Sequence, residues 1–324
     1  MEELGIALVG YGHWGPNLAR SLDDVDGAAL RAVCVRTERG ASAAARLGID
    51  ATTDLGRVLE RSDVDVAVVA TPAPSHAELA RRALLAGKHV MVEKPLATSL
   101  AAARDLITLA ADRGRTLMVG HVYVYHPVVR RLAELLSAGD LGDLVCVASE
   151  RGNPTGTPAD GSVLWNLAPH DLSIVVHLLG GDARRVSART PEVAREGGEE
   201  LVFLTIELAS GALVEIQVSW IAPTKTRRMT FTGSAAIAVF DELAAEALEV
   251  FARRNGEPPE RLAIPPPAAI EPLHAQWDEL VSAVREGREP VTGARHALAV
   301  QRLAEAATRS LARRGADVVP AADP

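Results

Sequence analysis

The first 120 residues alternate short apolar runs with stretches that have a helical period. The apolar runs lie at 5–9, 29–35, 64–70, 88–92 and 116–120, and the helical stretches at 16–22, 40–47, 75–86 and 98–112. Strand–helix alternation predicts a parallel sheet with right-handed crossovers. Because the runs are apolar almost throughout, we expect helices to cover both faces of that sheet. The sequence therefore predicts a doubly wound α/β domain over residues 1–120.

Residues 121–324 follow a different pattern. A helix is expected at 127–138, and strands at 144–151, 201–208, 212–220, 226–232 and 236–240. One helix, 169–179, interrupts this series, and helices at 273–286 and 294–314 close the chain. These elements predict an α+β domain with a largely antiparallel, open-faced sheet. We expect the Pro-rich segment 255–272 to be an ordered loop and the tail 315–324 to fray.

The composition limits the class of protein. Of 324 residues, 48% are hydrophobic and 23% charged, which is typical of a soluble globular chain with room for two domains. The net charge of −8 is spread without a basic stripe, which argues against a nucleic-acid or membrane-surface binder. No apolar run reaches membrane-spanning length and no signal-peptide pattern is present, so we expect a cytoplasmic protein. Cys34 and Cys146 are interpreted as core thiols, not as a disulfide or a metal pair.

A glycine-rich turn joins the first expected strand to the first expected helix. Gly10, Gly12 and Gly15 fit the pattern G-x-G-x-x-G, in which the first glycine permits a tight turn and the second lets the backbone approach a pyrophosphate. The third allows close packing of helix on strand, and the amino end of the helix faces the anion. The turn predicts a Rossmann dinucleotide site, to which we also assign the intervening His13 and Trp14.

The end of the second strand indicates which dinucleotide is bound. Enzymes that use NAD commonly place an acidic residue there for the ribose diol, whereas this chain reads Cys34-Val-Arg36-Thr37. The guanidinium of Arg36 can meet a 2′-phosphate, and the hydroxyl of Thr37 can add a donor. We therefore expect NADP(H) to be favoured, with NAD(H) as the alternative.

Two further strands end at the edge of the sheet where open α/β folds bind ligands. Thr71-Pro72 follows the third strand and is expected beneath the nicotinamide or its ribose. His76 opens the next helix, either as a cofactor contact or as a residue bonded to backbone. Glu93-Lys94-Pro95 ends the fourth strand. A lysine there can hydrogen-bond a reacting oxygen, stabilise developing charge and pass a proton, while Glu93 orients the lysine or the nicotinamide.

These motifs resemble those of the glucose–fructose oxidoreductase / inositol dehydrogenase / MocA (Gfo/Idh/MocA) family. The resemblance rests on the order of the glycine turn, Thr71-Pro72-x-x-x-His76, Ala86-Gly-Lys-His-Val90 and Glu93-Lys94-Pro95, and on the C-terminal segment 277–306. It covers nearly the whole chain. It implies an enzyme that transfers hydride between a nicotinamide cofactor and a ring carbon of a sugar or cyclitol. It also implies that Lys94 contacts the reacting oxygen. Pro95 is expected to fix the turn, and in one interpretation it does so through a cis peptide bond.

The same family often has the motif D-x-x-x-H in its second domain, with the histidine as acid/base. His170 matches that histidine, but Asn166 stands in place of the aspartate. An amide cannot supply the charge that raises histidine basicity, although it can orient substrate, so more of the proton transfer falls to Lys94. Asp171 either substitutes in part or is a first-turn helix carboxylate. The run Val163–Ser173 is similar to a subgroup associated with nucleotide-sugar metabolism, including 3-keto-sugar reduction.

Other substrate contacts are expected at the crossover between domains and on the strand that follows. Tyr123 and His126 are candidates, with hinge packing as the other interpretation, and Arg151 and Asn153 could hold a hydroxyl or a phosphate. A basic group at 225–228 could meet a diphosphate, although a solvated strand face is the simpler interpretation. No cysteine or carboxylate cluster surrounds His170, so no metal site is predicted.

The sequence thus predicts an NAD(P)-dependent sugar dehydrogenase or ketoreductase acting on CH–OH groups. The favoured substrate is a nucleotide-linked 3-keto sugar that is reduced in a biosynthetic pathway. A free cyclitol or glycoside dehydrogenase, a nonenzymatic NAD(P)-binding sugar sensor, and an enzyme that retains its cofactor for internal redox cycling are the alternatives. The family commonly pairs subunits through the open face of the C-terminal sheet, which implies a homodimer or homotetramer.

Overall fold

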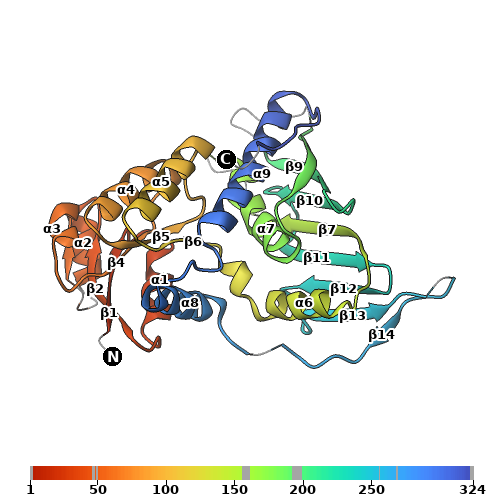
Figure 1. The fold of residues 1–324 in the computed structure, drawn as a ribbon, viewed down its shortest axis with the longest axis horizontal. Coiled ribbons are helices and arrows are strands. Elements are labelled where there is room, and N and C mark those ends of the chain that lie inside the picture. The colour runs from red at the N-terminus through yellow and green to blue at the C-terminus, as the bar shows by residue number, and fades with distance from the viewer. Residues whose placement is uncertain are drawn as a thin grey trace. The chain divides into compact units, whose positions relative to one another are not determined.

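The computed structural model describes residues 3–45, 48, 50–154, 161–191, 199–254, 256–267 and 269–321. The chain forms two compact units, Met1–Tyr125 with Ile270–Gln301, and His126–Ala269 with Arg302–Pro324 (Figure 1). The second unit therefore differs from the stretch 121–324 expected from the sequence, because a C-terminal segment packs with the N-terminal part. Within the part of the chain that the structure describes, no helix combines the length and apolar character needed to cross a membrane.

A six-stranded parallel sheet forms the centre of the first unit. Its strands are β1 (Leu4–Val9), β2 (Ala28–Cys34), β3 (Ala51–Thr52), β4 (Val66–Val69), β5 (His89–Glu93) and β6 (Leu117–Gly120). Their order is β3-β2-β1-β4-β5-β6, so the direction of winding reverses between β1 and β4 and the predicted doubly wound topology is confirmed. The sequence missed β3, because two residues carry no periodic signal.

Helices cover both faces of this sheet. They are α1 (Gly15–Leu22), α2 (Glu38–Ala45), α3 (Leu55–Leu59), α4 (His76–Leu85), α5 (Leu100–Asp112) and α8 (Pro272–Glu286), with 3-10 turns η1 (Ala73–Ser75) and η2 (Val122–Tyr125). Alternate residues of β1 enter separate cores: Ala7 and Val9 pack with residues of α3, α4 and α5, whereas Ile6 and Leu8 pack with α1, α2 and α8. Trp277 of α8 is fully buried in the second core, and its indole N–H donates to Ser21 Oγ over 2.9 Å.

An eight-stranded sheet forms the centre of the second unit. Its strands are β7 (Leu144–Gly152), β8 (Ala183–Arg189), β9 (Leu201–Leu208), β10 (Leu213–Ser219), β11 (Thr226–Gly233), β12 (Ala236–Asp241), β13 (Leu248–Ala252) and β14 (Glu260–Leu262). The order is β14-β13-β12-β11-β7-β10-β9-β8, and neighbouring strands are antiparallel except for β7 and β10. The predicted, largely antiparallel sheet is confirmed. The sequence missed β8, β13 and β14, and β14 lies in the segment expected to be a loop.

The remaining helices are α6 (Pro127–Ala138), α7 (Val163–Leu179) and α9 (Ala294–Ala312), which is divided between the units. The expected helix 169–179 is therefore too short, because α7 begins at Val163 and continues through Pro169. The expectation of a frayed tail is wrong for its described part, since Val318 is buried and pairs with Val186. Both cysteines are free; Cys34 is buried as expected, whereas Cys146 is only half-buried.

Candidate active site

The glycine-rich turn between β1 and α1 has the geometry that a pyrophosphate requires. Gly10 has a φ of 107°, and a Cβ there would lie 2.4 Å from the carbonyl oxygen of Ala70, so no larger residue fits. A Cβ on Gly12 would meet no atom within 4 Å, which leaves open space beside the backbone. A Cβ on Gly15 would lie 3.0 Å from the Gly10 carbonyl oxygen. Together with the start of α1 at Gly15, these features fit a dinucleotide phosphate.

The end of β2 exposes a cation. Arg36 and Thr37 are both exposed, and the Thr37 hydroxyl accepts a hydrogen bond from the Gly40 N–H over 3.2 Å at the start of α2. Glu38 is the first carboxylate after the strand, and its Oε1 accepts from the Thr53 hydroxyl over 3.0 Å. Of these side chains, the guanidinium of Arg36 is the one suited to a 2′-phosphate.

The turn that carries Lys94 follows β5. Lys94 is half-buried, and its peptide bond to Pro95 is cis. The carboxylate of Glu93 accepts from the Trp14 indole N–H at Oε1 over 2.9 Å and from the Lys94 backbone N–H at Oε2 over 3.3 Å. Burial raises the pKa of Glu93 to about 7, while the charge of Lys94 and the bond from Trp14 act in the opposite direction. The lysine turn is therefore tied to the glycine-rich turn.

His76 holds the other side of the same turn. Its ring is 1% exposed, with Nδ1 2.7 Å from the carbonyl oxygen of Pro95 and Nε2 2.7 Å from that of Thr71. Both partners are carbonyl oxygens, which only accept, and whichever ring nitrogen donates, the ring stands between the end of β4 and the lysine turn. Both ring nitrogens of His76 thus contact backbone oxygens, as expected if His76 is a residue bonded to backbone. Thr71 also pairs through its hydroxyl with that of Ser75, at 2.7 Å.

Two histidines near this turn were not singled out from the sequence. His121 follows β6 and is 2% exposed, and its ring centroid lies 5.2 Å from that of His296 in an edge-on arrangement. Burial lowers the pKa of His121 well below its usual range, and the charges of His296 and Lys94 add to this effect. The strand ends of β5 and β6 thus gather an acid, a lysine and a neutral imidazole. In this crossover segment, only Tyr123 and His126 were expected from the sequence as site residues.

In the second unit, the predicted substrate residue Arg151 forms a buried ion pair with Asp171. Its Nε donates to Oδ2 over 2.7 Å and its Nη2 to Oδ1 over 3.0 Å, and the Ser149 hydroxyl adds a bond of 3.0 Å to Oδ1. The side chains of Arg151 and Asp171 are 3% and 1% exposed. Asp171 lies in the middle of α7, so the interpretation as a first-turn carboxylate is wrong, because the helix begins eight residues earlier at Val163.

The other predicted residues of the second unit lie in separate surroundings. Asn166 is exposed on α7 and His170 is half-buried one turn later, so they share a helix face. The Oδ1 of Asn153 accepts from Arg227 Nη2 over 2.6 Å. His126 caps α6, because its Nδ1 accepts from the Val128 N–H over 3.2 Å, and its ring packs against Phe240. In the first unit, Tyr123 lies half-buried on η2.

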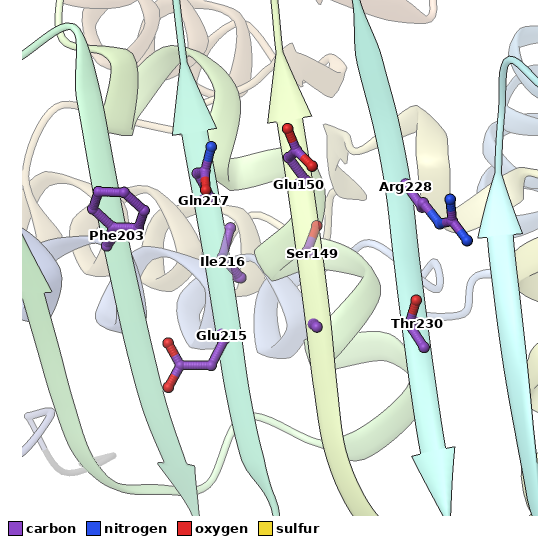
Figure 2. Close-up of a pocket in the computed structure, with 9 residues that line it drawn as sticks. Ser149, Glu150, Phe203, Glu215, Ile216, Gln217, Arg228 and Thr230 are labelled. Atoms are coloured by element: carbon purple, nitrogen blue, oxygen red, sulfur yellow. The ribbon is translucent and has the colours of Figure 1, made fainter. Parts of the chain in front are cut away.

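The face of the eight-stranded sheet opposite α7 has a shallow depression of about 290 Å³ (Figure 2). Strands β7, β9, β10 and β11 contribute its walls. Phe203 is 45% exposed on β9, opposite Gln217 of β10, and the polar side chains that line the rest of the depression include Glu215, Glu150 and, on the far side, Arg228. In the described residues, no three His, Cys, Asp or Glu side chains gather in an arrangement that could hold a metal ion.

Two family models match the chain. One is described as an oxidoreductase family with an NAD-binding Rossmann fold (GFO_IDH_MocA) and matches residues 4–121. The other, the GFO/IDH/MocA C-terminal domain, matches residues 129–239. Together they cover the parallel sheet and the mixed sheet from β7 to most of β12.

Named relatives differ in what they act on. A 4-carboxy-2-hydroxymuconate-6-semialdehyde dehydrogenase from Sphingobium sp. is 28% identical over 298 residues, covering 88% of this chain and 91% of its own. A dTDP-3,4-didehydro-2,6-dideoxy-alpha-D-glucose 3-reductase from Actinomadura kijaniata is 33% identical over 47% of this chain and 48% of its own. The solved structure of GenD2 from gentamicin A biosynthesis, in complex with NAD, is 30% identical with a TM-score of 0.85 and covers 99% of this chain and 97% of its own.

Proposed function

Because the chain belongs to the Gfo/Idh/MocA family of oxidoreductases, we propose that it reduces the 3-keto group of a nucleotide-linked sugar with NADP(H) in a biosynthetic pathway. The observation that carries this proposal is the Lys94 turn, held by Glu93 on one side and His76 on the other. The name of the Actinomadura relative supports a nucleotide-linked keto sugar. The name of the Sphingobium relative supports only the wider class of dehydrogenases.

The glycine-rich turn and the start of α1 would hold the pyrophosphate, with His13 and Trp14 beside it. Thr71, Pro72 and Glu93 would face the nicotinamide end. When bound, the nicotinamide supplies the hydride. The Lys94 ammonium donates a hydrogen bond to the substrate carbonyl oxygen and stabilises the negative charge that develops there.

His170 is the second proton donor in this proposal, and Asn166, one turn earlier on α7, orients a substrate hydroxyl. Asp171 does not replace the missing aspartate, because both of its carboxylate oxygens are committed to Arg151 and Ser149 in the core. More of the proton transfer therefore falls to Lys94. Tyr123 is a further proposed substrate contact. The contacts of Arg151 favour a structural role over substrate binding.

The cofactor preference is proposed from Arg36. A guanidinium exposed at the end of β2 pairs with a 2′-phosphate, whereas the Glu38 carboxylate is bonded to Thr53. We expect NADPH to bind more tightly than NADH, with NAD(H) as the alternative because GenD2 was solved with NAD. Arg36→Asp should reverse the ratio of the two dissociation constants, measured by cofactor fluorescence. An unchanged ratio would exclude this role of Arg36.

The substrate is tested by following NADPH oxidation at 340 nm with dTDP- and UDP-linked keto sugars and with free keto-cyclitols. Saturation by a nucleotide-linked keto sugar supports the proposal, and saturation by a free cyclitol alone overturns it. Lys94→Met should abolish turnover and retain NADPH binding, while Lys94→Arg keeps the charge and should retain part of the activity. NADPH binding without turnover of any compound in the panel would favour the sensor instead.

For assembly, we propose a homodimer or homotetramer formed through the face of the sheet shown in Figure 2. Phe203 is large, apolar and 45% exposed there, and the same depression is lined by charged groups of both signs. Apolar contacts ringed by polar groups are typical of subunit interfaces.

A further inference from the structure

We propose that Trp14 is a positioning residue that couples the glycine-rich turn to Lys94: its indole N–H holds the Glu93 carboxylate, and that carboxylate fixes the backbone of the lysine turn. The inference rests on the proposed role of Lys94 and extends it to a residue outside the lysine turn.

The hydrogen bonds of the carboxylate show the coupling directly. Trp14 is the residue before α1, and its Nε1 donates to Glu93 Oε1 over 2.9 Å. The other oxygen accepts from the backbone N–H of Lys94. The two oxygens of the Glu93 carboxylate therefore accept from two different segments. One of the donors, Trp14, lies 79 residues before Glu93 in the sequence. Movement of the glycine-rich turn is transmitted to the lysine turn through this group.

The absence of a side chain at Gly120 leaves the space that the Glu93 carboxylate occupies. Gly120 lies opposite Glu93 in the pairing of β5 with β6. A Cβ on Gly120 would lie 2.8 Å from Oε1 and 3.1 Å from Oε2 of Glu93. The carboxylate is thus packed against the backbone of the neighbouring strand, and a side chain as small as alanine would displace it.

The pKa of the Glu93 carboxyl is set by burial and by its neighbours Lys94 and Trp14. Lys94 on its own turn and Trp14 from the start of α1 both lower the pKa of Glu93, and burial raises it to about 7. His121, at the end of β6, is kept neutral by burial and adds no charge near neutral pH. Loss of the indole N–H should therefore raise the pKa of Glu93 further, so that more of the carboxyl is protonated at neutral pH. Lys94 would then lose its negative neighbour.

The test measures the Glu93 carboxyl itself. In protein labelled with ¹³C at glutamate carboxyls, Glu93→Gln identifies the signal, and the pH titration of wild type is compared with that of Trp14→Phe. We expect a higher midpoint in Trp14→Phe, NADPH binding weakened about three- to tenfold, and the acid limb of the kcat profile moved in the same direction. Trp165→Phe is the matched control, because it removes an indole N–H that donates to Thr308 Oγ1 over 3.0 Å in the other unit, and it should not move the midpoint.

An unchanged Glu93 midpoint in Trp14→Phe would overturn the inference, whatever the NADPH affinity, because Trp14 is also a proposed cofactor contact. If Trp14→Phe does not fold, Gly120→Ala is the second variant, since it displaces the carboxylate while the indole remains; an unmoved midpoint there has the same meaning. These readouts require no sugar substrate. A shifted midpoint in an enzyme that turns over no keto sugar would therefore reject only the proposed substrate, and keto-sugar turnover with an unmoved midpoint would reject only the role of Trp14.

Discussion

Replacement of Arg151 by methionine should destabilise the second unit severely. The guanidinium is 3% exposed and makes two bonds of 2.7 and 3.0 Å to Asp171, which is itself 1% exposed. Removal of one partner leaves a buried carboxylate with only the Ser149 hydroxyl as a donor among these contacts. Breaking such a pair typically lowers the free energy of unfolding by about 3–5 kcal/mol.

The surface pair Arg185–Glu207 provides the matched control. Its closest N–O distance is also 2.7 Å, but the side chains are 57% and 25% exposed. Arg185→Met should therefore change the free energy of unfolding by at most about 1 kcal/mol. The double variant Arg151→Met/Asp171→Leu should recover most of the loss, because it leaves no buried charge. Urea unfolding followed by far-UV circular dichroism measures all four variants, including Asp171→Leu alone.

One combination of results would refute the structural role of Arg151. If Arg151→Met lowers the free energy of unfolding by less than about 1 kcal/mol and raises KM with kcat unchanged, Arg151 is a substrate contact and the structural interpretation is wrong. Loss of stability that the double variant restores supports the structural interpretation, because a substrate contact would leave the stability unchanged.

Three other substitutions test separate features. Gly10→Ala should weaken NADPH binding in a fluorescence titration and cost about 1–3 kcal/mol of stability, because φ is 107° and the Ala70 carbonyl lies 2.4 Å from the new Cβ; wild-type affinity would contradict this. The pKa of Glu93 rises from 4.5 unfolded to about 7 folded, so its contribution to stability is complete below pH 4.5 and is lost as the pH rises through 7. Glu93→Gln should therefore raise Tm relative to wild type at about pH 8 but not at about pH 4, and an equal difference at both values would exclude the shift. Phe203→Glu should lower the mass in analytical ultracentrifugation to that of a monomer, whereas an unchanged oligomer would exclude this face.

The sequence predicted best what is encoded locally. Apart from β3, the strands of the parallel sheet are apolar runs, and those before β6 are each followed by a helix, so periodicity located β1, β2, β4, β5 and β6 within a few residues. Lys94 was found because it directly follows a strand end, and parallel strands place such ends at one edge. Short edge strands such as β3 and β14 offered no comparable signal.

Contacts between distant segments could not be predicted. Trp277 reads as part of an amphipathic C-terminal helix, and nothing in that pattern indicates that it packs beside Ser21 in the first unit. Arg151 and Asp171 each have an ordinary surface interpretation, and only the fold buries them together. For the same reason the predicted first residue of α7 was too late in the sequence. Pro169 resembles a residue of the first helical turn, whereas here tertiary packing stabilises a helix that continues past it.

The lysine turn shows why the motif Glu93-Lys94-Pro95 alone is weak evidence of activity. A lysine on a free turn would sample many positions, and its use as a donor to one oxygen requires that they be restricted. The restriction comes from two other motifs: Trp14 in the glycine-rich turn bonds Glu93, and His76, 19 residues before Pro95, contacts its carbonyl. A chain with the lysine motif but without donors at positions 14 and 76 would hold its amine loosely. The co-occurrence of the three motifs therefore has a physical cause, because the lysine turn takes one contact from the glycine-rich turn and another from His76.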